Sequence, residues 1–425
     1  MSKVKAQLDR ETYDVHLEAA ELGIQEQVGV LHRNLRKEDL PASFQYVASW
    51  DAHPGKFMLD PRLDLHSGEQ YPEVSAPGFG IFLDSAPDRW GRMLMERREA
   101  AEADREDRPM KALREVDFLL GVHDTTRMGA LRFRKTDGVI FLDDREKAAP
   151  PVTSLGELAD ISRKLEEPGV EILPEYERWL AMLIAPGTSL GGARPKANFT
   201  DLTGKLWFAK FPSKEDRYDV AGWEFIVHQM ARDAGILVPD SRLESFGEGY
   251  RTFCVERFDR VNESRRMFVS AMTLLERQDG QAGASYVDLV ELISDQGAQN
   301  HIDADLEQLY RRVVFNVLVG NRDDHLRNHG FIRNKTGWRL APAFDMNPSL
   351  YKPEHALTLD GNVAAPSMKA VRETAEDFYR LTRAQADAIE KQVMDVVKAW
   401  PERAALLGMS RFEVQQMTKV FLAGL

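Results

Sequence analysis

The feature that most constrains the fold is a strongly apolar pattern with helical spacing in the second half of the chain. Its members recur every three or four residues, and they are Leu306, Leu309, Tyr310, Val313, Val314, Val317 and Leu318. This spacing predicts a buried α-helix, and Gly320 with the polar residues after it predicts where that helix ends. The polar segment 321–328 therefore follows directly on a rigid element.

After this segment the pattern changes from helical spacing to alternation about a turn. Residues 329–333 and 338–341 flank the turn residues 334–337, which include Gly337, and together they predict a β-hairpin. The hairpin leads to Asp345. One tight substructure is therefore expected to present Asp323, then Asn328 five residues later, and Asp345 across the hairpin.

These three side chains are the set that phosphoryl transfer requires. One carboxylate orients the attacking hydroxyl and accepts its proton, while an amide oxygen and a second carboxylate hold Mg²⁺ against phosphates. The spacing Asp-x-x-x-x-Asn of kinase catalytic loops is met by Asp323, and Asp324 misses it by one residue. We therefore predict Asp323 as the base and Asn328 with Asp345 as metal ligands. The alternative, a polar loop that only caps the helix end, stays open.

Two histidines in the same segment allow a different site. His325 and His329 are four residues apart and could bind zinc if they lay on one helix. Gly330 and the strand expected after it argue against a helix there. A hydrogen-bonding role is therefore favoured for His325.

A lysine in an apolar strand supplies the second element. Lys210 shares a strand face with Leu206 and Phe208, and an ammonium in such a place needs an anion. Nucleotide phosphates would serve, although a lysine at a sheet edge that reaches water is the alternative. Glu224 lies early in the following helix, and kinases pair such a lysine with a helix glutamate.

Two further segments are weaker signals. Glycines in the loop 188–196 would let backbone amides approach phosphates, although the loop matches neither a Walker A motif nor the kinase glycine-rich loop, and an ordinary turn is the alternative. The segment 255–260 stands where strands give way to helices, as the adenine-holding hinge of kinases does. A plain strand end is its alternative.

Length and composition limit the remaining choices. A chain of 425 residues is expected to form two or three domains, for which we predict the ranges 1–145, 152–260 and 261–425, with a linker around 143–151. The single cysteine, Cys254, and a polar start without a secretory signal lead us to expect a cytoplasmic protein. No apolar run is long enough for a membrane span. The net charge of −12 gives no general attraction to DNA, and a local basic patch stays open as an alternative.

The pattern of the other segments predicts the remaining elements. The strands are expected at 12–17, 27–32, 44–50, 128–133, 139–142, 206–211, 236–239 and 251–258, and the helices at 84–105, 155–165, 175–183, 223–234 and from about 375 onward.

Several of these motifs, in this order, resemble the HipA family, the kinase toxins of bacterial type II toxin–antitoxin systems. The most specific pair is 316–329 with 340–345. The other segments that carry the resemblance are 79–90, 121–133, 189–196, 208–212 and 256–260. The resemblance implies an α+β, protein-kinase-like two-lobed fold with an extra N-terminal β-rich subdomain and an all-helical C-terminal lobe.

The resemblance also implies residue roles in an ATP- and Mg²⁺-dependent serine/threonine protein kinase. Asp323 would be the catalytic base, and Asn328 and Asp345 would be the Mg²⁺ ligands. Ser189 would be an autophosphorylation site that switches the enzyme off. The nucleotide would be bound by Lys210, Glu256, Arg257, Phe258, Gly191, Gly192, Ala193 and His325. The chain also departs from ordinary kinases in having Phe-Asp-Met at 344–346 in place of Asp-Phe-Gly.

The same resemblance implies partners and leaves alternatives. A small helix-turn-helix antitoxin resembling HipB would bind the protein and carry any contact with DNA, and the substrate would be a translation component such as an aminoacyl-tRNA synthetase. The first alternative is a small-molecule kinase of the same fold. The second is a degenerate kinase that acts as a co-repressor scaffold.

Overall fold

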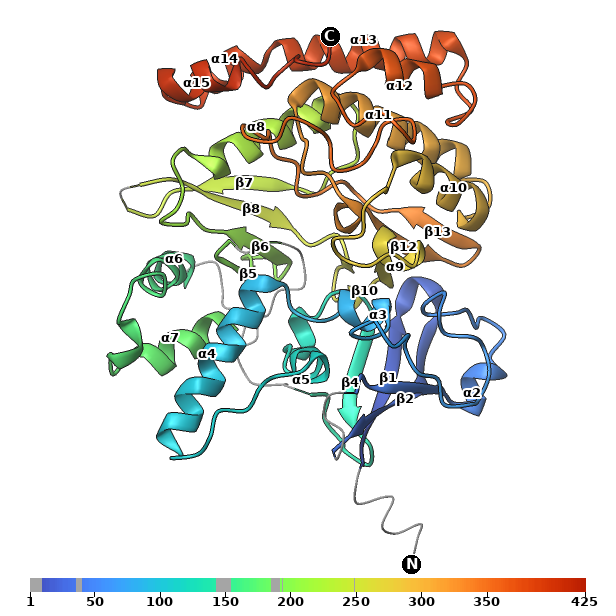
Figure 1. Cartoon of the computed structure of the whole chain (residues 1–425), viewed down its shortest axis with the longest axis vertical. Coiled ribbons are helices and arrows are strands. Elements are labelled where there is room, and N and C mark those ends of the chain that lie inside the picture. Colours follow the sequence, from blue (N-terminus) through green and yellow to red (C-terminus); the bar gives the residue numbers. More distant parts are fainter. Residues whose placement is uncertain (1–9, 36–39, 143–153, 185–191, 193, 248) are drawn as a thin grey trace, which may run out of the picture. The chain divides into compact units, whose positions relative to one another are not determined.

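The computed structural model describes residues 10–35, 40–142, 154–184, 192, 194–247 and 249–425 (Figure 1). By internal contacts the chain divides into two compact units. The first contains residues up to Ala209 together with Asp259–Val269, and the second contains Lys210–Phe258 together with Ser270–Leu425. The three domain ranges expected from the sequence stay a prediction.

The first unit contains a four-stranded antiparallel sheet with the order β3-β2-β1-β4. Its strands are β1 (Arg10–Ala19), β2 (Ile24–Asn34), β3 (Ser43–Tyr46) and β4 (Leu131–Lys135). Alternate side chains such as Val15 and Leu17 are fully buried. Two expectations are corrected here. The strand at 44–50 stops at Tyr46, because buried Trp50 lies on α2 (Ala48–Asp51), and 139–142 forms no strand.

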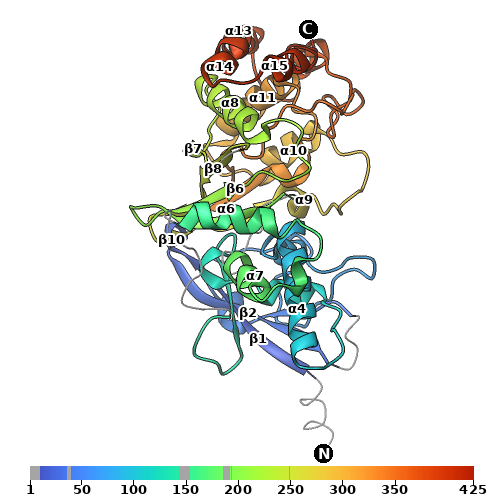
Figure 2. The ribbon, with the colours of Figure 1, turned by 90° about the vertical axis from the view of Figure 1, so that its left-hand side faces the viewer.

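The helices of this unit include α3 (Gly80–Asp84), α4 (Arg89–Arg105), α5 (Glu115–Leu120), α6 (Leu155–Lys164) and α7 (Tyr176–Ile184). The helix start expected at Asp84 was wrong, because Asp84 closes α3. The cap of α4 is Asp88, whose side chain accepts a hydrogen bond from the Gly91 amide at 2.9 Å. α4 and α7 pack side by side (Figure 2). β5 (Lys196–Thr200) and β6 (Leu206–Lys210) are neighbouring strands.

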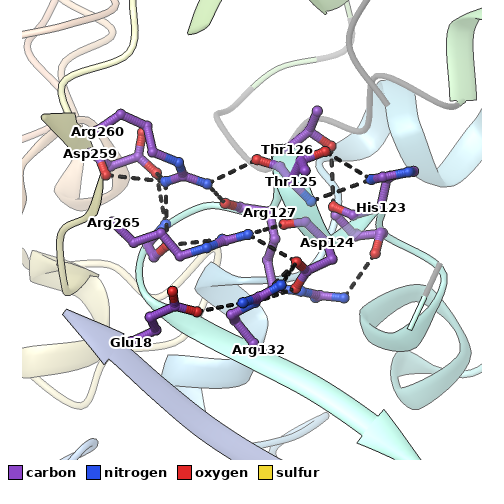
Figure 3. A network of polar contacts seen from close by, with 12 residues as sticks. Glu18, His123, Asp124, Thr125, Thr126, Arg127, Arg132, Asp259, Arg260 and Arg265 are labelled. Atoms are coloured by element: carbon purple, nitrogen blue, oxygen red, sulfur yellow. Dashed lines mark hydrogen bonds and ion pairs between the residues drawn. The ribbon is translucent and has the colours of Figure 1, made fainter. Parts of the chain in front are cut away.

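A buried ionic network joins the segment 259–269 to the rest of the first unit (Figure 3). This segment contains β9 (Arg260–Val261), β10 (Ser264–Arg265) and most of β11 (Phe268–Ser270). Arg265 donates to the backbone oxygen of Asp124 at 2.6 Å, and Asp259 accepts from the Gly129 amide at 2.8 Å. Burial favours the neutral form of Asp124, but Arg132 and Arg265 outweigh it and lower the pKa of that carboxyl. The network therefore holds distant parts of the sequence together.

The second unit begins with α8 (Val220–Asp233), which packs on the antiparallel pair β7 (Ser241–Glu244) and β8 (Thr252–Glu256) (Figure 1). α8 ends as predicted, with Gly235 in the left-handed conformation at φ +81°. The strand expected at 236–239 was wrong, because those residues form no ladder and the strand begins at Ser241.

The rest of the second unit is mostly helical, and the predicted apolar helix is its centre. α11 (Ile302–Val319) buries Leu309, Val314 and Val317 completely. The predicted hairpin is formed by β12 (Gly330–Asn334) and β13 (Gly337–Leu340), so the expectation of an all-helical lobe is corrected at this point. The remaining helices are α9 (Ala271–Leu274), α10 (Tyr286–Gln296), α12 (Met368–Thr374), α13 (Arg383–Lys398), α14 (Trp400–Leu406) and α15 (Arg411–Met417). Within the described ranges, no helix is both long and apolar enough to cross a bilayer.

Candidate functional site

The end of α11 fixes where the polar segment begins. Gly320 closes the helix in the left-handed conformation at φ +68°. A Cβ atom at this position would lie 2.3 Å from Cγ1 of Val420, so the site admits only glycine without a shift. The amide of Asn321 then donates to the Asn316 carbonyl at 2.9 Å. The chain therefore leaves the helix in one defined direction.

The next residues form neither helix nor strand, and the two adjacent aspartates differ in exposure. The side chain of Asp323 is 57% exposed, whereas that of Asp324 is 5% exposed. An exposed carboxylate can meet an incoming hydroxyl, and a buried one cannot. Of the two carboxylates, Asp323 is therefore the exposed one, and its role as the base stays a prediction.

Asp324 is the centre of a buried hydrogen-bond cluster below the segment. Its Oδ2 accepts from the Tyr286 hydroxyl at 2.6 Å, from Asn316 Nδ2 at 2.9 Å, and lies 2.7 Å from Nε2 of His329. Burial favours the neutral acid, but His329 and the Tyr286 hydroxyl stabilise the anion more strongly, so the pKa of Asp324 is lowered. This carboxylate joins α10, α11 and the residue just before β12.

Lys210, the predicted phosphate-binding lysine, lies between two carboxylates. Its Nζ lies 2.5 Å from Oε1 of Glu224 on α8 and 2.6 Å from Oδ1 of Asp345. Burial disfavours the ammonium, but the Asp345 and Glu224 carboxylates outweigh it and raise the pKa of Lys210 above its ordinary value. The lysine is therefore charged, nearly buried at 13% exposure, and held between two anions.

The second aspartate of the set stands in an unusual backbone conformation. Asp345 has φ +57°, in the left-handed region that non-glycine residues rarely adopt. Phe344 before it stacks on Phe258, with ring centroids 5.3 Å apart. The end of the predicted adenine segment therefore contacts the residue next to Asp345. Within that segment Arg257 is buried, and the Glu256 amide donates to the Asp240 carbonyl at 2.8 Å.

Asn328 and His325 lie in the same segment as Asp323. Asn328 is buried, and its Nδ2 donates to the backbone oxygen of Asp323 at 3.4 Å. The amide oxygen of an asparagine is a ligand suited to a hard cation. Nδ1 of His325 is buried, and no hydrogen bond to it is found among the described residues. Its nucleotide-contacting role stays a prediction.

The zinc alternative finds no support in the geometry. Leu326–Asn328 forms a short 3-10 turn, η5, and His329 directs Nε2 at Asp324. In the described part of the chain, no cluster of three histidine, cysteine or acidic side chains suits a metal ion. A Mg²⁺ site formed by Asn328, Asp345 and phosphate oxygens would be of another kind, because protein groups supply only part of its ligands.

Five of the nine positions of the predicted glycine loop, 188–191 and 193, lie outside the described residues. Ser189, Gly191 and Ala193 are not described. Gly192 is, with φ +93°, and its carbonyl accepts from Nζ of Lys196 at 2.9 Å. Lys196 also forms a buried ion pair with Asp88 at 2.6 Å within the first unit. The roles of the loop residues in binding and regulation stay predictions.

Sequence reasoning missed two groups beside Asp323. Lys352 forms an ion pair with the Asp323 carboxylate, and Arg322 donates to the Lys352 carbonyl at 2.7 Å. Lys352 lies 29 positions away, in a segment without helix or strand, so neither spacing nor periodicity could indicate it. The Asp324 cluster was also missed, although the polar Asn316 within the apolar helix was a usable signal.

The family model of the HipA-like C-terminal domain matches residues 188–400, which is half of the chain and includes Lys210, Asp323, Asn328 and Asp345. The chain belongs to the HipA family.

Two curated relatives show how far the likeness extends. The serine/threonine-protein kinase toxin HipA of Shewanella oneidensis is 28% identical over 190 residues, 38% of this chain and 43% of that protein. Toxin YjjJ of Escherichia coli is 23% identical over 253 residues, 54% of this chain and 56% of that protein. The chain spans about half the length of the curated relatives it matches.

The fold matches over a much longer range than the sequence does. A chain in the solved complex of HipA, HipB and operator DNA from Shewanella oneidensis superposes with a TM-score of 0.66 at 18% identity. The match covers 96% of this chain and 94% of that one. This likeness establishes the protein-kinase-like HipA fold predicted from the sequence.

Proposed function

We propose that this HipA-family protein is a serine/threonine protein kinase that transfers the γ-phosphoryl group of ATP to a hydroxyl. The observation that carries the proposal is the position of Lys210 between Glu224 and Asp345. A charged, nearly buried lysine held by a helix glutamate is the phosphate-binding arrangement of protein kinases. An exposed Asp323 on the same unit supplies the base.

Each residue of the site has a separate task in this proposal. When ATP binds, the ammonium of Lys210 leaves Asp345 for the nucleotide phosphates. Its ion pair with Glu224 is kept and holds the ammonium near the nucleotide. Asp345 and Asn328 would then hold Mg²⁺, because both offer the oxygen ligands that this ion prefers. A bound Mg²⁺ would neutralise charge on the phosphates. Asp323 orients the acceptor hydroxyl and takes its proton.

The adenine would lie against the segment Glu256–Phe258, with His325 near the nucleotide. Phe258 offers an aromatic face that is already packed on Phe344, next to Asp345. The loop with Gly191, Gly192 and Ala193 would cover the phosphates through its backbone amides. Phosphorylation of Ser189 would place two negative charges in this loop and expel it from the nucleotide site.

The biological setting is proposed from the family. The substrate is a cytoplasmic protein of translation, for which an aminoacyl-tRNA synthetase is the model, and modification of it halts growth. A helix-turn-helix antitoxin binds the kinase and carries the contact with operator DNA. Support comes from the HipA, HipB and operator complex whose chain shares this fold.

Phosphoproteomics after brief expression tests the function directly. The wild type and Asp323→Gln are compared at equal protein level, because the exposed side chain makes a folding defect improbable in the variant. We expect growth arrest and new phosphoserine or phosphothreonine on a small set of proteins, only with the wild type. Phosphate found on a metabolite instead would make the protein a small-molecule kinase. Arrest by both forms, with no new phosphate, would support the scaffold alternative.

A further inference from the structure

The segment that follows Asp345 is fastened to the catalytic segment by one arginine. Arg322 donates from Nη1 to the Lys352 carbonyl at 2.7 Å, and its backbone amide donates to Oγ of Ser349 at 3.2 Å. The carbonyl of Arg322 accepts from the Ala356 amide at 3.0 Å. These bonds fix the backbone of Lys352 beside Asp323.

The side chain of Lys352 forms an ion pair with the carboxylate of Asp323. Both side chains are about half exposed, at 50% and 57%. Exposed ion pairs contribute little to stability, so this one can open at small cost. A lysine also carries a compact charge on a flexible stem, which lets the ammonium move while its backbone stays fixed.

The proposed position of the substrate brings this ammonium close to the transferred group. An acceptor hydroxyl on Asp323 lies about 2.6–3.2 Å from the carboxylate. Its oxygen must approach the γ-phosphorus to about 3–3.5 Å before reaction. A lysine whose ammonium contacts the carboxylate can therefore reach the γ-phosphoryl oxygens by a rotation of its side chain.

We infer that Lys352 is a further catalytic residue, whose ammonium leaves Asp323 and binds the γ-phosphoryl group when ATP and the acceptor are bound. This inference rests on the proposed kinase function. The acceptor oxygen forms a bond to the γ-phosphorus, and the bond from that phosphorus to the β–γ bridging oxygen breaks with its electron pair on ADP. The hydroxyl proton passes to Asp323. Lys352 keeps its proton and stabilises the charge on the equatorial oxygens.

The assignment makes a prediction that separates ATP from ADP, because only ATP carries the γ-phosphoryl group. Lys352→Met should weaken ATP binding about tenfold, the loss of one charged hydrogen bond, and leave ADP binding unchanged. The turnover number should fall about 100-fold. Lys352→Arg should restore part of both losses, because it keeps the positive charge.

The experiment measures ATP and ADP affinities by titration calorimetry with Mg²⁺, and phosphate transfer under the same conditions. Lys335→Met, in the exposed turn of the β12–β13 hairpin, is the matched control and should change neither quantity. The assignment would be overturned if the ratio of ATP affinity to ADP affinity stayed the same, whether both affinities fell equally or neither changed. A higher turnover in Lys352→Met would also overturn it, because the lysine would then only block Asp323. If the wild type bound no ATP, the proposed function itself would fail.

Discussion

The adjacent aspartates Asp323 and Asp324 should respond in opposite ways to the same substitution. Asp324→Asn removes a buried negative charge that accepts from Tyr286, Asn316 and His329. Hydrogen bonds to a charged group contribute about 1 kcal/mol more than neutral ones, so three of them give a loss of roughly 3 kcal/mol in the free energy of unfolding. For a unit of this size that is a fall in Tm of about 6–12 °C.

The matched variant Asp323→Asn changes an exposed side chain instead. Its Tm should stay within about 1–2 °C of the wild type, because surface substitutions alter stability by roughly 0.5 kcal/mol or less. Its phosphate transfer should be lost, since the base is gone. Differential scanning calorimetry on both proteins, with transfer assays below their unfolding temperatures, measures the contrast.

The pH dependence gives a second check on the Asp324 variant. The pKa of Asp324 is lower in the folded protein than in the unfolded chain, so its stabilising effect is complete above the unfolded value of about 4. The effect is lost as the pH falls through the folded value. The Tm difference between the wild type and Asp324→Asn should therefore be full at pH 7 and shrink below about pH 4. An Asp324→Asn protein as stable as the wild type at pH 7 would refute the role of the cluster.

Three other predictions concern separate parts of the second unit. Lys210→Met should lower the rate of phosphate transfer about 100-fold or more. Because the pKa of Lys210 is raised, a pH–rate profile of the wild type should show no loss from deprotonation of this lysine up to pH 9. Gly320→Ala should cost about 1–3 kcal/mol, because its Cβ would meet Val420, and thermal melts would show it. Burial raises the pKa of the Cys254 thiol to about 12, so a thiol reagent at pH 8 should modify it only after denaturant is added.

The parts of the fold that sequence predicted well carry a strong local signal. α11 and the β12–β13 hairpin were predicted because their apolar spacing and turn residues are unmistakable. The choice of Asp323 over Asp324 as the base rests on spacing and stays a prediction. The predictions of strands at 139–142 and 236–239 were wrong, because a short apolar run does not show whether a partner strand lies beside it.

The parts that could not be predicted depend on contacts between distant residues. Asp324 meets Tyr286 from 38 positions away, and Asp124 meets Arg265 from 141 positions away. Nothing in either local sequence indicates such a partner. The ion pair of Lys210 with Glu224 was anticipated only as a possibility of the kinase pattern, and its distance came from the structure.

Transfer of radioactive phosphate from γ-labelled ATP tests the central claim most directly. Purified wild-type protein with Mg²⁺ is incubated with a heat-treated cell extract, whose own kinases are inactive and whose nucleotides have been removed, and Asp323→Asn and Lys210→Met run beside it. The account predicts label on serine or threonine of protein, including Ser189 of the kinase itself, with the wild type alone. Equal labelling by the wild type and Asp323→Asn, or no labelling by any of the three, would contradict it.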